Sequence, residues 1–311
     1  MAAQSRARVF IDGEAGTTGL QIRERLALVP EIDVLSIDPA KRKDAEARKA
    51  LMAASDVVVL CLPDDAAKDA VALADSLGNS SPKIVDASTA HRIAPGWAYG
   101  FAELNAGQAT AIASARRVAN PGCYPTGAIA LLRPLIDAGL IPADAAITVN
   151  AVSGYSGGGK SMIEAYEAGA APLFELYGLG LEHKHVPELM AYAGLTRRPI
   201  FVPSVGNFRQ GMLVSIPLHL DLLPGRPSLT DFEAALEAHY AGSELVRTVR
   251  GATKDLGGRI AGETLAGSDT LELFVFGKPD FHQAVLVARL DNLGKGAAGA
   301  AVQNIKLMLA L

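Results

Sequence analysis

The chain has 311 residues, half of them hydrophobic and a fifth charged, with a net charge of −4. This length predicts about two domains, and the scattered Lys and Arg residues offer no basic face for nucleic acid. Two cysteines exclude a disulfide scaffold and suggest a reducing compartment. The longest apolar runs, such as 57–62 (VVVLCL), fall far short of the ~20 residues that cross a bilayer, and no apolar signal region opens the chain. We expect a cytoplasmic α/β protein with no membrane contact.

The first part of the chain alternates short apolar strands with helices. The strands are predicted at 8–12, 34–37, 57–62 and 83–86, and the helices at 20–28, 42–54 and 64–77. Parallel neighbours need long crossovers, so this order predicts a Rossmann-type, doubly wound parallel sheet. We expect a dinucleotide-binding domain over 1–118.

The pattern changes after residue 119, where longer strands follow one another with few helices between them. This favours a mixed or antiparallel sheet. The strands are predicted at 146–152, 200–205, 212–220, 271–277 and 283–291, with a helix at 230–240. We expect an α+β catalytic and oligomerisation domain over 119–292, and a last helix, 293–311, that packs back on the first domain.

A glycine-rich loop follows the first predicted strand. Gly13, Gly16 and Gly19 give the spacing G-x-x-G-x-x-G between a strand and a helix, which is the setting of a dinucleotide pyrophosphate loop. Thr17 and Thr18 open the helix, whose N-terminal N–H groups would bind the phosphates. An ordinary glycine-rich turn is the alternative.

The second predicted strand leads to Asp38, which could accept a hydrogen bond from the ribose 2′-hydroxyl of NAD. Lys41 and Arg42 follow, and such cations suit the extra 2′-phosphate of NADP. The sequence therefore favours NADP over NAD. A solvated start of a helix is the alternative for these residues.

Cys123 stands within NPGCYPTG, between a Pro-Gly turn and a helix predicted at 127–136. A thiol at a helix N-terminus has a lowered pKa and a larger thiolate fraction. This setting favours a nucleophile over the usual buried, hydrophobic role of cysteine. Cys61, in the middle of an apolar strand, fits the buried role.

His183 and His185 lie just before a helix that begins near Pro187. Imidazoles exchange protons near neutral pH and could serve a thiol nucleophile. No further cluster of His, Cys or carboxylates accompanies them, so we expect no metal site.

The segment Gly154–Ser161 matches the phosphate-loop pattern of nucleotide hydrolases. Such a hydrolase needs a later apolar strand that ends in Asp to hold Mg²⁺. The strand at 200–205 ends without an acid, and the one at 212–220 contains Pro217. We therefore expect this loop to serve a nicotinamide cofactor or an acyl phosphate, with a nucleotide hydrolase as the alternative.

Six motifs together resemble the shorter, second type of N-acetyl-γ-glutamyl-phosphate reductase, a family of arginine biosynthesis. They are VFIDGEAGTTGLQI, VDASTAHR, NPGCYPTGA, SGYSGGGK, HKHVPE and DNLGKGAAGAAVQN, and they span nearly the whole chain. Aspartate-semialdehyde dehydrogenases, which share the fold and a catalytic cysteine, are the alternative of the same class. A regulator that binds NADP without turnover is the alternative of another class.

The resemblance implies NADPH-dependent reduction of the small molecule N-acetylglutamyl 5-phosphate to the 5-semialdehyde, through a thioester on Cys123. His183 or His185 would exchange protons, and Glu188 would orient the histidine. Cofactor contacts are implied for Ser88, Thr89, Ser156, Gly157, Gly158 and Asn292, and substrate contacts for Arg92, Asn120 and Lys160. The family also implies a homo-oligomer, either a tetramer or a dimer.

Overall fold

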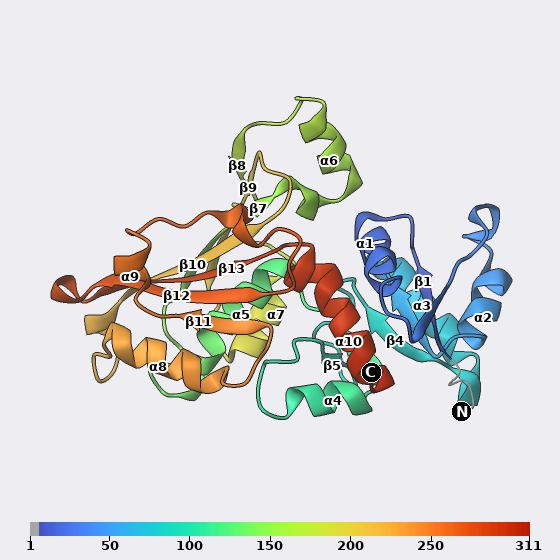
Figure 1. The fold of residues 1–311 in the computed structure, drawn as a ribbon, viewed down its shortest axis with the longest axis horizontal. Coiled ribbons are helices and arrows are strands. Elements are labelled where there is room, and N and C mark those ends of the chain that lie inside the picture. The colour runs from blue at the N-terminus through green and yellow to red at the C-terminus, as the bar shows by residue number, and fades with distance from the viewer. Residues whose placement is uncertain (1–5) are drawn as a thin grey trace. The chain divides into compact units, whose positions relative to one another are not determined.

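The computed structural model describes residues 6–311, which form two compact units (Figure 1). Unit 1 contains the described residues up to Ala102, together with Ala106–Pro121 and Ala297–Leu311. Unit 2 contains Glu103–Asn105 and Gly122–Gly296. Within the described range, no helix combines the length and the apolar character that a membrane span requires.

Unit 1 is built on a six-stranded sheet in the order β2-β1-β3-β4-β6-β5, with every neighbouring pair parallel. The strands are β1 (Ala7–Asp12), β2 (Ile32–Leu35), β3 (Val57–Leu60), β4 (Lys83–Asp86), β5 (Ala98–Tyr99) and β6 (Arg117–Ala119). The predicted doubly wound parallel sheet is confirmed.

Helices cover both faces of this sheet, so its central strands are buried on both sides. They are α1 (Thr17–Leu26), α2 (Ala45–Ala53), α3 (Asp64–Asp75), α4 (Gln108–Ser114) and α10 (Gly299–Leu309), with short 3₁₀ turns η1 (Pro39–Lys41) and η2 (Gly78–Ser80). Val9 and Ile11 of β1 pack with α1, α4 and α10, while Phe10 packs with α2 and α3. Asn304 of α10 donates to the Gly100 carbonyl at 2.9 Å, which ties the last helix into this unit.

The strand order reverses between β1 and β3, and dinucleotides bind at such a switch point in this class of fold. Two glycines of the segment after β1, Gly13 and Gly19, are packed there without room for a side chain. Gly13 has φ +92°, and a methyl group on it would lie 2.3 Å from the Cys61 carbonyl oxygen at the end of β3. A methyl group on Gly19 would lie 2.6 Å from the Gly13 carbonyl oxygen. Both positions therefore require glycine.

Unit 2 contains a seven-stranded sheet in the order β11-β12-β13-β10-β7-β9-β8. The strands are β7 (Thr148–Gly154), β8 (Phe174–Leu176), β9 (Ile200–Gly206), β10 (Met212–His219), β11 (Val246–Val249), β12 (Leu271–Lys278) and β13 (Gln283–Leu290). The pairs β11–β12 and β7–β9 are parallel and the others antiparallel. The predicted mixed sheet is confirmed.

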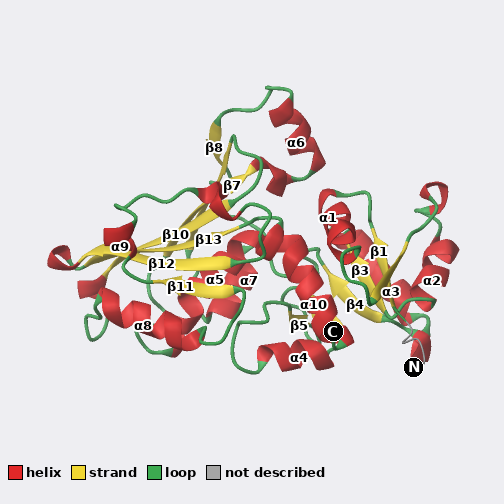
Figure 2. Cartoon of the chain, viewed as in Figure 1, coloured by secondary structure: helices red, strands yellow, loops and turns green. Residues whose placement is uncertain are grey.

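Two helices pack against one face of this sheet, as Figures 1 and 2 show: α5 (Cys123–Asp137) and α8 (Leu229–His239). A third, α7 (Val186–Ala193), packs against α5. Shorter elements are α6 (Lys160–Glu167), α9 (Ala252–Asp255), the 3₁₀ turns η3 (Tyr155–Gly158), η4 (Leu220–Leu222), η5 (Gly262–Leu265) and η6 (Pro279–Phe281), and a π-helical turn (Gly294–Ala298). Gly127 brings α5 close to β10, because a methyl group there would lie 2.8 Å from a Val214 methyl carbon. The helix that carries Cys123 is therefore fixed directly on the sheet.

The glycine loop gives a first prediction. Gly13→Ala should lower the free energy of unfolding by about 2–4 kcal/mol, because it combines a left-handed backbone with a steric clash. Gly78→Ala is the matched control in the same unit: its φ is +57°, but no atom lies within 4 Å of the added carbon. It should cost only about 1 kcal/mol. Urea denaturation followed by circular dichroism measures both, and equal losses would contradict the close packing of the loop.

Candidate active site

Cys123 is the first residue of α5, with Gly122 as the extended N-cap residue. The helix therefore begins four residues earlier than the predicted Gly127. Pro125 does not delay it, because a proline in the first turn lacks only an N–H that has no partner within the helix. The half-buried thiol lies at a helix N-terminus, where the backbone N–H groups and the helix dipole favour an anionic sulfur.

Glu188 of α7 holds the turn that carries this thiol. Its side chain is 1% exposed, and its Oε2 accepts a hydrogen bond from the Gly122 N–H at 3.1 Å. The family resemblance implied that Glu188 orients a histidine, which stays a prediction, and the hydrogen bond to Gly122 fixes the N-cap of the cysteine helix. The carboxylate thus acts on the backbone of the nucleophile.

The two histidines lie together before α7. The His183 Nδ1 accepts a hydrogen bond from the His185 backbone N–H at 3.1 Å, so in the neutral ring the proton of His183 lies on Nε2. The two ring centroids are 4.7 Å apart. His185 is buried and occupies the N-cap of α7, whereas His183 is half-buried. Of the two, His183 is the more open to a small molecule.

Two tyrosines connect Cys123 to His183. Tyr124 donates to the Ser204 carbonyl at 2.9 Å, and Tyr177 donates to the Tyr124 hydroxyl at 3.1 Å. Burial, Tyr177 and Cys123 raise the pKa of Tyr124, while burial, with Cys123 contributing, raises the pKa of Tyr177 to about 12. Both phenols therefore stay neutral near pH 7. Both rings also lie near the His183 ring, with centroids 6.3 and 5.8 Å away.

The second cysteine has a different environment. Burial raises the pKa of the Cys61 thiol to about 12, with further contributions from Asp86 and Asp12. Cys61 thus remains a neutral thiol near pH 7, and neither cysteine forms a disulfide bond.

The segment Gly154–Ser161 runs from the end of β7 through η3 into α6, but its backbone does not form a phosphate cradle. Three successive N–H groups, those of Gly154, Tyr155 and Ser156, donate to the carbonyls of Gly211, Phe208 and Arg209 at 2.9, 2.9 and 3.1 Å. The Lys160 side chain is 81% exposed and lies 3.7 Å from Glu164. This geometry differs from that of a nucleotide hydrolase loop, whose N–H groups point at phosphate.

Asn292 holds the same loop from the end of β13. Its Nδ2 donates to the Ser156 Oγ at 2.9 Å, and its Oδ1 accepts from the Gly211 N–H at 2.8 Å. Gly157 lies beside them, because a methyl group there would be 3.0 Å from the Ser153 Oγ. Ser156, Gly157 and Asn292, for which the family resemblance implied cofactor contacts, therefore lie together, with Gly158 next in the loop.

In unit 1, the residues expected at the ribose lie differently. The strand β2 ends at Leu35, so the assumption that Asp38 ends it was wrong. Asp38 is exposed and caps the turn η1 by accepting from the Ala40 N–H at 2.9 Å. Lys41 and Arg42 follow as exposed side chains.

Sequence reasoning missed a cluster at the true end of β2. Arg23 of α1 donates to the Ser36 Oγ at 2.7 Å and pairs with Glu14 of the glycine loop, and Ser36 donates to Glu14 at 3.0 Å. A guanidinium and a hydroxyl at this strand end are suitable donors for a phosphate. If the strand had been predicted to end at Leu35, Ser36 would have been identified as the residue that follows it.

Ser88 and Thr89 follow β4 in a turn held by carboxylates. The Ser88 backbone N–H and hydroxyl both donate to Asp86, at 2.9 and 2.8 Å, and the Thr89 N–H donates to Asp64 at 2.9 Å. Asp86 is buried and also contacts the His91 Nδ1 at 2.6 Å. The turn after β4 is thus rigidly built.

Arg92 and Asn120, expected at the substrate, are buried in unit 1. The Arg92 Nε donates to the Asn120 carbonyl at 3.1 Å. The Asn120 amide donates to the Ala297 carbonyl at 2.9 Å and accepts from Asn304 at 3.0 Å. These contacts join β6 to the C-terminal segment, which is a structural role for the Asn120 side chain.

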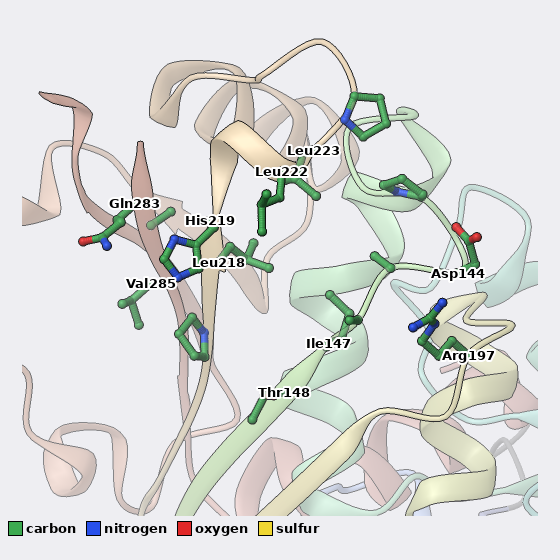
Figure 3. Close-up of a pocket in the computed structure, with 16 residues that line it drawn as sticks. Asp144, Ile147, Thr148, Arg197, Leu218, His219, Leu222, Leu223, Gln283 and Val285 are labelled. Carbon is green, nitrogen blue, oxygen red and sulfur yellow. The ribbon is translucent and has the colours of Figure 1, made fainter. Parts of the chain in front are cut away.

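A cavity of about 760 Å³ in unit 2 contains none of the catalytic, cofactor or substrate residues proposed from the sequence (Figure 3). Thr148, Arg197, His219 and Val285 are among its lining residues. It lies at the beginning of β7 and the end of β10, the opposite ends of these strands from the Gly154 loop. Across residues 6–311, no three His, Cys, Asp or Glu side chains gather in a way that could hold a metal ion.

Comparison with known proteins relates this site to a family. Residues 123–292 match the family model described as semialdehyde dehydrogenase, dimerisation domain. The chain is 56% identical over 307 residues to the N-acetyl-gamma-glutamyl-phosphate reductases of Brucella ovis and Brucella canis, covering 97% of this chain and 98% of each relative.

Solved structures share the fold at low identity. Aspartate semialdehyde dehydrogenase II from Vibrio cholerae, complexed with ASA, has a TM-score of 0.71 at 15% identity, covering 99% of both chains. Aspartate semialdehyde dehydrogenase with NADP from Candida albicans has a TM-score of 0.69 at 15% identity, covering 98% of this chain and 99% of that one.

The two thiol environments give a second prediction. Iodoacetamide at pH 7 should add one carbamidomethyl group to the folded protein, at Cys123, and leave Cys61 unmodified, because only a thiolate reacts. Mass spectrometry of tryptic peptides locates the adduct. A urea-unfolded sample should take up two groups, and modification of Cys61 in the folded protein would contradict this description of the site.

Proposed function

The chain belongs to the N-acetyl-γ-glutamyl-phosphate reductase family, and from this membership we propose that it reduces N-acetyl-L-glutamyl 5-phosphate to N-acetyl-L-glutamate 5-semialdehyde. The reaction releases phosphate and would serve arginine biosynthesis in the cytoplasm. The observation that carries the proposal is Cys123 at the first position of α5. Glu188 accepts a hydrogen bond from the N-cap residue of this helix, and the His183 ring lies near the rings of Tyr124 and Tyr177.

Cys123 supplies the nucleophile. Its thiolate forms a bond to the γ-acyl carbon of the substrate, and the bond from that carbon to the phosphate oxygen breaks. The products of this half-reaction are inorganic phosphate and a thioester on Cys123, which accepts hydride more readily than a carboxylate does. The N-terminus of α5 favours the thiolate both before the attack and when the sulfur leaves again.

His183 is the better candidate for the proton transfer. Its proton lies on Nε2, because its Nδ1 accepts from the His185 backbone. A ring in this tautomer can donate to the oxygen on which negative charge develops when the acyl carbon becomes tetrahedral. His185, buried at the N-cap of α7, would fix the position of His183.

The cofactor we propose is NADP, which when bound in its reduced form, NADPH, would supply the hydride that takes the acyl group to the aldehyde level. The fit rests on the glycine loop, where Gly13 and Gly19 leave no space for side chains and α1 begins directly after Gly16. For the 2′-phosphate we propose Arg23 and Ser36 at the end of β2, supported by the exposed Lys41 and Arg42. Arg23 would have to break its ion pair with Glu14 in order to bind the phosphate.

We further propose that the protein is a homo-oligomer, either a tetramer or a dimer, formed through the outward side of the unit 2 sheet. Ile200 is 50% exposed on β9. Val285 is 38% exposed on β13 and lines the cavity of Figure 3. Pro217, paired with Val285 across the sheet, is exposed as well. Such an apolar strip on a sheet suits a second copy of the chain.

The reductase proposal predicts turnover in the reverse direction, which avoids the labile acyl phosphate. N-acetylglutamate 5-semialdehyde, phosphate and NADP⁺ should yield NADPH, followed by its absorbance, with at least tenfold lower kcat/KM for NAD⁺. Cys123→Ser should lose more than a thousandfold of kcat, because no thioester can form. His183→Asn should lose about 10²–10⁴-fold, the usual contribution of a positioned acid or base.

Aspartate semialdehyde is the parallel substrate that separates the related reductases. If the protein turns over aspartate semialdehyde in preference to N-acetylglutamate 5-semialdehyde, the substrate assignment changes and the proposed mechanism stays the same. Absence of NADPH with both aldehydes, in a folded sample that binds NADP⁺, would refute the reductase proposal.

The proposed interface predicts that Val285→Arg weakens self-association, because it places a charge within the apolar strip. Sedimentation velocity should show oligomers for the unaltered protein and a shift to smaller species for the variant. Leu28→Arg, at a residue that is 83% exposed in unit 1, is the control and should leave the distribution unchanged. A monomer before any substitution would contradict the interface.

A further inference from the structure

A buried ion pair near the nucleophile takes no part in the chemistry above. Lys295 is 1% exposed, and its Nζ donates to both carboxylate oxygens of Glu103, at 2.8 and 2.7 Å. Burial lowers the pKa of Lys295, and Glu103 opposes that shift. Removing both charges from water is costly, so the pair is poorly explained as a source of stability. It does have a defined direction, since two hydrogen bonds from the one ammonium nitrogen reach both oxygens of the same carboxylate.

Lys295 lies within the π-helical turn Gly294–Ala298. The Gly296 N–H donates to the Asp291 carbonyl, five residues earlier, at 2.9 Å. Such turns are rare and are found often at functional sites. This one is tightly specified, because a methyl group on Gly294 would lie 2.0 Å from the Ser268 carbonyl oxygen. Fully buried Asp291 also accepts from the Leu293 N–H at 3.0 Å.

The turn lies directly against the nucleophile. A methyl group on Gly296 would lie 2.9 Å from the Cys123 Cβ and 3.3 Å from its Cα. Meanwhile Glu188 holds the preceding residue, Gly122, through its N–H. The backbone of Cys123 is therefore fixed by two contacts, one with α7 and one with the π-helical turn.

We propose that Lys295 and Glu103 are positioning residues for Cys123: their ion pair holds the π-helical turn against the cysteine and thereby fixes the thiol at the N-terminus of α5. This inference rests on the proposed function only in that Cys123 is its nucleophile. When the pair is broken, the turn can relax and Cys123 can move with it. A displacement of about 1 Å is enough to change the rate of a positioned reaction about 10²-fold.

The test compares two variants that each remove the cation of a buried ion pair in unit 2. Lys295→Met breaks the pair beside Cys123. Arg289→Met breaks one of the two ion pairs of Glu272, which also pairs with Arg247. The Arg289 Nε lies 2.9 Å from the carboxylate, and the Arg289 and Glu272 side chains are 13% and 6% exposed. The readouts are the rate constant of Cys123 with iodoacetamide at pH 7, kcat and KM in the reductase assay, and urea denaturation.

We expect Lys295→Met to slow the alkylation of Cys123 at least tenfold and to lower kcat about 10²-fold, with less than a threefold change in KM. Arg289→Met should stay within twofold of the unaltered protein in both rates, even if it is equally destabilised. A folded Lys295→Met with unchanged alkylation and kcat would overturn the proposal. Equal losses in Arg289→Met would overturn it as well, since they would reflect general destabilisation.

If Lys295→Met does not fold, Glu103→Gln and Gly296→Ala carry the test. The first keeps the shape of the carboxylate and removes its charge, and the second presses a methyl group against Cys123. Both should slow alkylation at least tenfold, and normal rates in both would refute the proposal. Alkylation needs no substrate, so failure of the reductase assay alone would count against the proposed reaction and not against the positioning role.

Discussion

The hydrogen bond from the Gly122 N–H to Glu188 is the contact on which the rest of the site depends. It sets the N-cap of α5, and the N-cap determines that the helix begins at Cys123. A buried carboxylate is tolerated there because a helix N-terminus favours negative charge. The same helix end thus serves two anions, the carboxylate permanently and the thiolate during the reaction. A shift of the helix start by one residue would turn the thiol away from this end.

Cys123 lies where the segment that enters unit 2 meets the segment that leaves it. The chain passes from unit 1 into unit 2 between Pro121 and Gly122, immediately before Cys123. It returns after Gly296, the residue that packs against Cys123. The two segments that bound unit 2 are therefore in contact at the thiol. In unit 1, the glycine loop at the switch point of the parallel sheet is also held in place by close packing, because Gly13 packs on the end of β3.

Local sequence was sufficient where one segment determines its own structure. The alternation of strands and helices predicted the parallel sheet, and the spacing of Gly13, Gly16 and Gly19 predicted a glycine-rich loop between the first strand and the first helix. Boundaries were less reliable: the helix predicted at 127–136 begins at Cys123, because its first turn tolerates Pro125, and β2 was placed two residues too far along. The short elements α4, β5 and β8 were missed because they contain too few residues for a periodic pattern.

Contacts between distant residues could not be read from the sequence. Glu188 lies 66 residues from Gly122, and nothing in either segment indicates that they meet. Lys295 would be assigned to the surface by its residue type, since lysine is seldom fully buried. Its burial depends on Glu103, which is 192 residues away. Roles of this kind emerge only when the fold brings the partners together.

The choice of a charged pair at this place has a physical reason. Two apolar residues of similar size could fill the volume around Lys295 and Glu103 at equal or lower cost in free energy. They would not, however, define a direction, because apolar contacts tolerate sliding and rotation. Two short hydrogen bonds from one ammonium group fix the distance between the segment 103–105 and the π-helical turn. A turn that must stay in contact with a reactive cysteine needs this directional constraint more than it needs additional stability.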